Sequence, residues 1–234
     1  MKLTASDGAA SDSFGVSVSL DGDNFLIGAY FKNSARGKAY SGSVSSMTTL
    51  DTGNASRTID GISFISQDDW IIGQSTDANQ VILTAGDTAN VTADGKAVYI
   101  GKNADSDHNQ LAIDGILIAT DVYVGAEGNT GNSLFLSDTA VLTLENNHIT
   151  AGNFLIIEGD YIDITNLLTY LGSTNLNVWD GSDWLEVNSD TYTDFFTTVY
   201  TSGQTHFQVI PEPGTCVLLG FGLGAVLLRR DCPD

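Results

Sequence analysis

Cysteine, proline and positively charged residues are scarce in this sequence. The 2 cysteines, Cys216 and Cys232, both lie near the C-terminus. The rest of the chain therefore has neither a disulfide bond nor thiolate chemistry. There are 3 prolines but 25 glycines, which indicates that Gly, Asn and Asp make most of the turns.

The shortage of lysine and arginine leaves the chain strongly acidic. Its 9 Lys and Arg face 29 Asp and Glu, a net charge of −20, and none of the 9 lies between Lys102 and Arg229. Such a chain repels phosphate backbones, so we expect no nucleic-acid partner. Anionic membrane surfaces would repel it as well. We interpret the acidic residues as a solvated surface.

The body of the chain also lacks a long amphipathic helix pattern. No run longer than about twelve residues keeps a period of 3.6 residues. Val, Ile, Thr and aromatic residues fill the segments between turn residues, which is typical of strands. With a hydrophobic content of 42%, the sequence predicts an all-β protein with a core of its own.

The N-terminal segment, residues 1–46, contains two strand patterns joined by a tight turn. After the lead-in LTASDG, residues 16–20 alternate as VSVSL, and residues 24–30 read NFLIGAY. With its pairs Phe14-Gly15 and Gly28-Ala29, this segment resembles an FG-GAP repeat, the blade unit of integrin-type β-propellers. A propeller needs at least four blades, so we expect this single unit to pack against the segment that follows.

Integrin blades carry an Asp-x-Asp-x-Asp-Gly calcium loop, which is missing from this unit. Asp21, Asp23 and Asn24 stand at the corresponding turn. We interpret them as hairpin-turn residues rather than metal ligands. No cofactor is therefore expected, and weak Ca²⁺ binding by loop acids is the alternative.

Residues 47–67 are rich in Ser and Thr and are predicted to be a linker, and residues 68–165 contain repeats. Aligned segments start at Trp70, Val98, Val122 and, in degenerate form, His148, with spacings of 28, 24 and 26 residues. Repeats of this length predict a solenoid whose coils bury their faces by stacking. We expect a short parallel β-solenoid of about 3–4 coils, and a β-sandwich is the alternative. The pattern resembles bacterial surface repeats.

Each repeat has the same internal order of features. A strand ends in glycine, at Gly73, Gly101 and Gly125, and a polar loop then leads to an asparagine, at Asn79, Asn109 and Asn132. Stacked asparagine amides can satisfy one another's hydrogen bonds, so we predict a structural asparagine ladder. Strand alternation predicts that the following residues point inward: Val98, Ile100, Leu111, Ile113, Ile116 and Ile118 in one coil, and Val122, Val124, Leu134, Leu136, Leu142 and Leu144 in the next.

Residues 166–209 break the repeat and are predicted to cap the solenoid. The sequence ITNLLTYLGS indicates a brief helix that ends at Gly172. The Asp180-Gly181 turn predicts a hairpin flanked by Trp179 and Trp184. Cross-strand packing is the expected role of these tryptophans, and stacking on sugars is the alternative. A second short helix and a last strand, THFQVI, follow.

Residues 210–234 form a tail of a different character. Pro-Glu-Pro precedes an uncharged run, Gly214–Leu228, and two arginines follow it. As a helix this run is about 22 Å long, against a hydrocarbon core of roughly 30 Å, and the arginines would hold its end in the cytoplasm. The tail resembles the PEP-CTERM sorting signal of Gram-negative bacteria. Its motif residues are Pro211, Glu212, Pro213, Arg229 and Arg230.

The resemblance to a sorting signal implies a route and a set of partners. An exosortase would recognise Pro-Glu-Pro, remove the hydrophobic C-terminal helix, and release or attach the body at the cell surface. Before that step the transmembrane helix would anchor the protein transiently in the inner membrane. Such proteins accompany exopolysaccharide and biofilm. The N-terminal MKLTASDG has no apolar stretch, so we expect upstream sequence with a signal peptide.

Catalytic groupings are not evident in the sequence. His108, His148 and His206 lack ligand spacing and are interpreted as surface or turn residues. The remaining loop acids are Asp105, Asp107, Asp180, Asp183, Asp190 and Asp194. We expect a non-catalytic surface or extracellular-matrix protein, structural or adhesive, and not an enzyme. The alternatives are a carbohydrate-active β-helix enzyme and a truncated, non-functional fragment of a longer FG-GAP protein.

Overall fold

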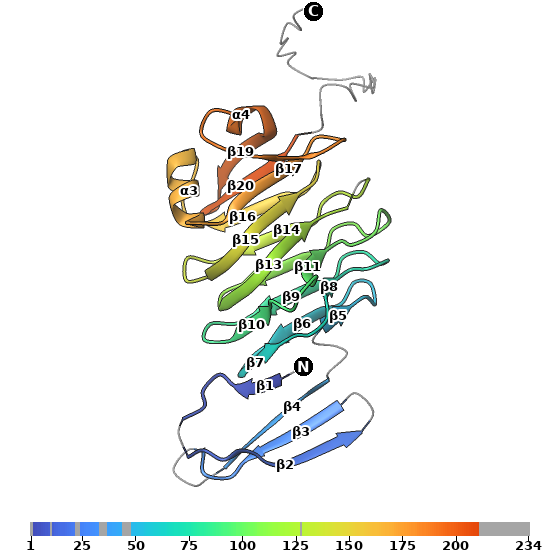
Figure 1. The fold of residues 1–234 in the computed structure, drawn as a ribbon, viewed down its shortest axis with the longest axis vertical. Coiled ribbons are helices and arrows are strands. Elements are labelled where there is room, and N and C mark those ends of the chain that lie inside the picture. Colours follow the sequence, from blue (N-terminus) through green and yellow to red (C-terminus); the bar gives the residue numbers. More distant parts are fainter. Residues whose placement is uncertain are drawn as a thin grey trace, which may run out of the picture.

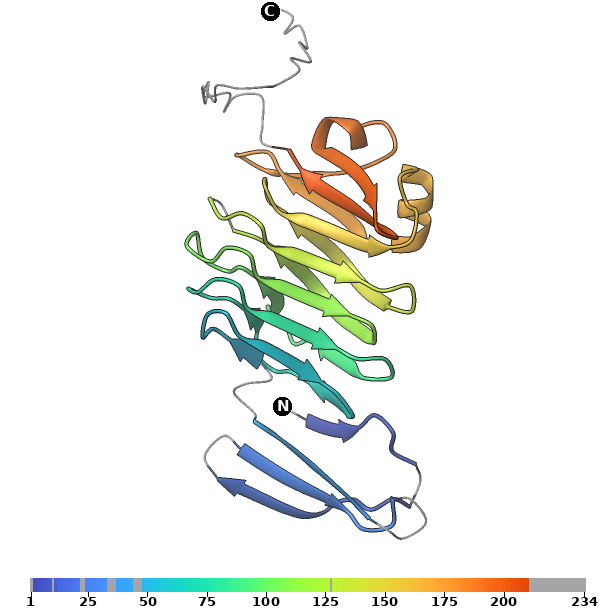
Figure 2. The same ribbon diagram turned by 180° about the vertical axis from the view of Figure 1, so that it is seen from behind.

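The computed structural model describes residues 2–9, 11–21, 24–32, 37–43, 48–126 and 128–210. Figure 1 shows an elongated molecule in which successive turns of the chain stack from an N-terminal sheet to two short helices at the other end. Figure 2 shows the same stack from behind. The tail expected to be a hydrophobic C-terminal helix, with its sorting motif, lies outside the described residues.

Three parallel columns of strands form the faces of the solenoid. The first face contains β5 (Thr49–Leu50), β8 (Trp70–Ile72), β11 (Ala97–Ile100), the second half of β13 (Ile116–Val124), the second half of β15 (Val141–Ile149) and β17 (Asn175–Trp179). The second face contains β6 (Ser56–Ile59), β9 (Gln80–Leu83), β12 (Gln110–Ile113), β14 (Ser133–Leu136) and β16 (Phe154–Glu158). The third contains β7 (Ile62–Ile65), β10 (Thr88–Val91) and the first halves of β13 and β15.

The parallel β-solenoid is confirmed, but the number of turns was underestimated. It has about five turns, because the segment 47–67, predicted to be a linker, contains β5, β6 and β7. These strands pair in parallel with the turn that follows, for example Thr49 with Ile71 and Ile59 with Leu83. The first turn differs in sequence from its neighbours, so self-similarity does not reveal it.

The interior of the solenoid is a continuous apolar column. Leu111, Ile113, Leu134 and Leu136 are all fully buried, as predicted. The prediction for Ile116 and Ile118 was wrong, since Leu117 and Ala119 face inward there instead. Every residue of the sequence ILIA is apolar, so alternation alone could not decide which set faces the core. The inward-facing residues of successive turns stack in register, as in Leu111↔Leu134.

The predicted asparagine ladder is present and is longer than the sequence indicated. Asn109 Oδ1 accepts hydrogen bonds from the backbone N–H and the Nδ2 of Asn79, both at 2.9 Å. Asn132 Oδ1 does the same for Asn109, at 2.9 and 3.1 Å, and Asn153 Oδ1 for Asn132, at 2.9 and 3.0 Å. All four are 0% exposed. Each turn is therefore joined to the next by a buried pair of side-chain hydrogen bonds.

The glycines that end the first-face strands make room for this ladder. Gly101 has φ of +75°, and a Cβ placed on it would lie 2.5 Å from the side chain of Asn132. Only glycine combines that backbone conformation with so close an approach. The glycine of one turn and the asparagine of the next are thus a matched pair.

The fourth repeat is displaced by one residue from its predicted alignment. Val122 pairs with Asn147, and Tyr123 pairs with His148. A slip of one residue exchanges the two faces of a strand. Asn147 therefore occupies an inward position between Val122 and Leu176, and His148 joins the outward row of Tyr99 and Tyr123.

The N-terminal unit covers the first turn of the solenoid. β1 (Lys2–Ala5) pairs antiparallel with β7, while β2 (Phe14–Asp21), β3 (Asn24–Ala29) and β4 (Lys38–Ser43) form a separate antiparallel sheet. Phe25, Ile27 and Tyr40 of this sheet are buried in one cluster with Ile62 of β7. The expected packing of the unit against the following segment is therefore observed. Its edge strand β2 keeps Val16, Val18 and Leu20 exposed.

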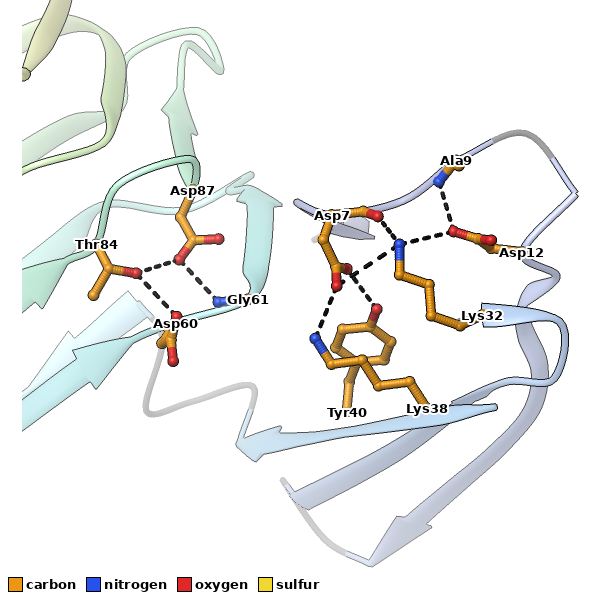
Figure 3. Close-up of polar contacts among 10 residues, drawn as sticks. All are labelled: Asp7, Ala9, Asp12, Lys32, Lys38, Tyr40, Asp60, Gly61, Thr84 and Asp87. Carbon is orange, nitrogen blue, oxygen red and sulfur yellow. Dashed lines mark hydrogen bonds and ion pairs between the residues drawn. The ribbon is translucent and has the colours of Figure 1, made fainter. Parts of the chain in front are cut away.

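A charged cluster attaches the lead-in sequence to the N-terminal sheet (Figure 3). Asp7 accepts hydrogen bonds from Tyr40 Oη at 2.6 Å and Lys38 Nζ at 2.9 Å. Both hydrogen bonds lower the pKa of Asp7, and the bond from Tyr40 has the larger effect. Lys32 bridges the main-chain oxygen of Asp7 and the carboxylate of Asp12, the latter at 2.9 Å. The cluster fixes the lead-in and leaves no charge of this group without a partner.

The C-terminal end carries the predicted cap. α3 (Ile164–Leu171) begins at the N-cap Asp163 and ends at Gly172, and β17 forms a hairpin with β18 (Trp184–Glu186). α4 (Tyr192–Phe195) leads into β19 (Phe196–Thr201) and β20 (Gln204–Val209), and β20 pairs antiparallel with β16. The last parallel strand of the second face is thereby covered.

Candidate functional site

An outward row of aromatic rings runs along the first face of the solenoid. Tyr99 and Tyr123 stack with ring centroids 5.1 Å apart and planes 11° apart, and Tyr123 and His148 stack at 4.5 Å and 9°. The spacing follows from the roughly 4.8 Å between hydrogen-bonded strands. The row thus arises because three successive strands place an aromatic ring at the same register position.

The β17–β18 hairpin folds over the end of this row. Trp184 meets His148 at 4.6 Å and Tyr123 at 6.0 Å, both in edge-to-face geometry, and Trp179 lies 5.4 Å from Trp184. Asp180 Oδ1 accepts backbone hydrogen bonds from Ser182 and Asp183, each at 2.8 Å, and so holds the turn. The predicted cross-strand pair Trp179↔Trp184 is confirmed, and it also forms a wall beside the aromatic row.

A hollow of about 240 Å³ lies between this wall and the row. Ala126 contributes only a methyl group to its lining. The hollow, here called the first hollow, is lined by Tyr99, Lys102, Tyr123, Gly125, Ala126, Thr150, Trp179 and Trp184.

The cation that lines the first hollow is paired with a carboxylate. Lys102 Nζ lies 2.8 Å from Asp69 and 4.3 Å from the centroid of the Tyr99 ring, a cation–π contact. Burial raises the pKa of Asp69, but hydrogen bonds from Lys102 and the backbone of Ala97 outweigh it and leave that pKa below its usual value. The cationic end of the hollow is therefore neutralised by its own carboxylate.

His148 is 9% exposed, and its Nε2 lies 3.1 Å from Asp121 Oδ1. Burial lowers the pKa of this imidazole, and the contact with Asp121 opposes that effect only in part. Burial likewise raises the pKa of Tyr99 and of Tyr123. At neutral pH all three rings of the row are uncharged, so the row offers apolar ring edges rather than a titrating group.

A separate concavity of about 500 Å³, away from the first hollow, lies on the second face. Ile82, Ala112 and Phe135 line it together with the acids Asp114, Asp138 and Glu158. Asp114 already accepts a hydrogen bond from Thr139 and one from Ser137 Oγ, the latter at 2.7 Å. Both bonds lower the pKa of Asp114, and the bond from Thr139 has the larger effect. This carboxylate serves the turn between β14 and β15.

The histidines predicted to be surface or turn residues lie apart from one another. His108 is in a turn with φ of +56°, and His206 is on β20. The prediction for His148 was wrong, because it lies buried on β15 beneath the hairpin. Within the part of the chain that the structure describes, no three His, Cys, Asp or Glu side chains lie close enough together to hold a metal ion. The loop acids Asp107 and Asp180 accept backbone hydrogen bonds, from Thr130 and from Ser182.

Sequence reasoning missed most of the first hollow. It singled out Trp179 and Trp184, but not Tyr99, Tyr123 or Lys102. A signal was present, because the segments VYIG and VYVG repeat a tyrosine before each strand-ending glycine. Nothing in the sequence showed that the hairpin tryptophans would fold against those tyrosines.

The comparison with protein families concerns the N-terminal unit. Residues 1–45 match the FG-GAP repeat. The match confirms the resemblance of this segment. No curated protein and no solved structure matches the chain.

An FG-GAP repeat joined to a β-solenoid is consistent with an extracellular repeat protein. The FG-GAP repeat here comprises β1 to β4 and covers the first turn of the solenoid. Among the described residues, no helix has the length and apolar character needed to cross a membrane. The aromatic hollow belongs to the solenoid and its cap, and lies outside the FG-GAP repeat.

Proposed function

We propose that this protein is a non-catalytic, adhesive surface or extracellular-matrix protein that binds polysaccharide in the first hollow. The observation that carries the proposal is the wall of Trp179 and Trp184 beside an outward row of aromatic rings. These rings lie outside the apolar column that holds the solenoid together. Four of them, Tyr99, Tyr123, Trp179 and Trp184, line the first hollow.

Carbohydrate suits this surface for a chemical reason. One side of a pyranose ring presents C–H groups, which pack on an aromatic face, while its hydroxyl groups remain hydrogen-bonded to water or to polar neighbours. Aromatic stacking of this kind is worth about 1–3 kcal/mol per ring where it has been measured for bases. Lys102 places a charged group at the edge of the same hollow.

The solenoid explains why the rings are held in place. Tyr99, Tyr123 and His148 stand on parallel strands whose inward neighbours are fully buried or nearly so. Their positions are therefore set by the core, and little conformational entropy is lost when a ligand binds. A rigid, shallow and repetitive surface fits adhesion to a polymer.

The first test is a change at Trp184. Replacing it by alanine removes the wall of the first hollow, so we expect Trp184→Ala to weaken polysaccharide binding by about tenfold or more. Trp184→Phe keeps an aromatic face and should retain most of the binding. Affinity electrophoresis in gels that contain neutral or acidic polysaccharides measures the effect.

The wild-type protein should be retarded in at least one such gel. If no polysaccharide retards it, or if Trp184→Ala is retarded as strongly as the wild type, the proposed function is wrong. Because Trp184 lies in the peripheral hairpin, far-UV circular dichroism should show that both variants keep the fold. If Trp184→Ala loses the fold, the test passes to Trp179→Ala, which removes the other ring of the wall and should weaken binding in the same way.

We further propose that the tail delivers the protein to the cell surface. Pro211, Glu212 and Pro213 followed by an uncharged run and two arginines support recognition by an exosortase. The apolar run would anchor the chain in the inner membrane until it is removed. Exopolysaccharide at the surface would then be the natural ligand of the hollow.

Processing of the tail can be tested by mass spectrometry. Expressed behind a functional signal peptide, the chain should lose its C-terminal peptide in a host that has an exosortase and keep it in a host without one. Replacing Glu212 by alanine should leave the tail intact in both hosts. An intact wild-type tail in both hosts would contradict the sorting proposal without affecting the proposal on carbohydrate binding.

A further inference from the structure

We infer that the ligand is a neutral polysaccharide that contacts Trp179 and occupies the two hollows that this side chain lines. The inference rests on the proposed function, since it concerns the same site. It adds two properties of the ligand, its lack of charge and its extension over at least two sugar units.

The second hollow adjoins the first. It also has a volume of about 240 Å³, and it is lined by Gly128, Asn129, Thr130, Thr150, Ala151, Gly152 and Trp179. Thr150 and Trp179 belong to both hollows. A ligand that crosses Trp179 can therefore reach both without leaving the surface.

The size of the hollows indicates an extended ligand. Sites for small molecules are usually concavities of about 300–1,000 Å³, and each hollow alone is smaller than that range. The two together fall within it. A polymer of small rings, with one ring in each hollow, fits this geometry better than a single compact molecule.

The second hollow contains no charged side chain among the described residues. Gly128 and Gly152 lack side chains, Ala151 contributes a methyl group, and the buried Asn129 uses its amide to bond the main-chain oxygens of Gly101 and Asn103, at 2.9 and 3.1 Å. Thr130 is exposed and offers a hydroxyl. The hollow thus suits an uncharged, hydroxyl-bearing ligand.

The first hollow discriminates against anionic sugars. Its one lining cation, Lys102, is held by Asp69 at 2.8 Å, and Asp121 lies beside His148. Asp180 and Asp183 occupy the turn that carries the two tryptophans. A uronate would meet net negative charge here, as it would over a chain of net charge −20, and its approach would be opposed electrostatically.

The charge of the ligand is tested with a panel of probes. Affinity electrophoresis of the wild-type chain is performed in gels containing glucan, galactan or mannan, which are neutral, and in gels containing pectate or alginate, which are polyuronates. We expect a neutral polysaccharide to retard the protein, and this retardation should change little with ionic strength. The polyuronates should cause no retardation. Retardation by polyuronates alone would overturn the inference while supporting the proposed function, and retardation by none would contradict both.

The extension of the ligand is tested with a variant of the second hollow. Oligosaccharides of increasing length, prepared from the polysaccharide that retards most strongly, are titrated by calorimetry. Wild-type affinity should rise by about tenfold or more from the monosaccharide to the disaccharide and longer chains, because a second hollow is filled. In Thr130→Phe the phenyl ring enters the second hollow, and the dependence on length should largely disappear.

The matched control is Thr143→Phe, which places the same ring at an exposed threonine on the third face. It should keep the wild-type dependence on length. If Thr130→Phe also keeps it, or if the wild type binds a monosaccharide as tightly as a longer chain, the second hollow has no part in binding. That result would leave the first hollow, and with it the proposed function, unaffected.

Discussion

Asn132→Ala is expected to lower the free energy of unfolding by about 3–5 kcal/mol. The substitution removes the oxygen that accepts hydrogen bonds from the backbone and the side chain of Asn109, and the amide that donates to Asn153. All of these groups are 0% exposed. A buried donor left without a partner costs about 1–3 kcal/mol, and here two donors of Asn109 lose their acceptor at once.

Chemical denaturation followed by far-UV circular dichroism measures this loss. The matched control is Asn175→Ala, because Asn175 is an exposed asparagine on β17 with a side-chain bond to Asn146. That change should stay within about 0.5 kcal/mol of the wild type. If Asn132→Ala and Asn175→Ala were equally stable, the ladder would contribute little to the stability of the fold. Its role would then be limited to positioning the polar loops.

Asn147→Val is expected to change stability in the opposite direction, raising the free energy of unfolding by about 2–4 kcal/mol. Asn147 is 0% exposed, and neither its Oδ1 nor its Nδ2 has a hydrogen-bond partner among the described residues. It stands in register between Val122 and Leu176. An unsatisfied buried amide is unfavourable by about 1–3 kcal/mol, and valine adds apolar contact in its place.

Asn147→Ala separates the two contributions to this gain. Alanine removes the unsatisfied amide without adding apolar contact, so its stability should fall between the wild type and the valine variant. The midpoint of thermal or chemical unfolding reports all three proteins in one experiment. A valine variant less stable than the wild type would mean that the amide of Asn147 is bonded, for example to a buried water molecule.

These two asparagines show why position within a turn matters more than residue type. Asn132 lies in a column where every turn supplies an asparagine, so each amide meets another amide. Asn147 lies in a column of valine and leucine, where no polar group is within reach. The same side chain is thus expected to stabilise the fold in one column and to destabilise it in the other.

Much of the fold was predictable because a solenoid is built from local repeats. Each turn contacts its neighbours only, so period, alternation and turn residues describe most of the interactions that stabilise it. The repeats from Trp70 onward, the inward Leu111 and Leu134, and the asparagine column were all evident in the residue pattern. The Asp180-Gly181 turn predicted the hairpin for the same reason.

Prediction failed where a single residue of register decides the outcome. The fourth repeat was predicted to start at His148, in line with Val122, whereas the structure pairs Val122 with Asn147. Both alignments agree with the spacing of the repeats, and only the pairing with Val122 and Leu176 distinguishes them. That slip places His148 beside Tyr123 and so completes the aromatic row.

The sequence by itself determined the all-β class, the stacked turns, the ladder and the cap, because these depend on contacts between neighbouring segments. Only the tertiary structure decided that the hairpin bearing Trp179 and Trp184 folds over Tyr123 and His148. The contacts of Trp184 with Tyr123 join residues far apart in the sequence, across two turns of the solenoid. They depend on how the cap packs on the last turn, which no repeat encodes. The hollows therefore follow from packing in three dimensions, while the turns that support them follow from the repeat.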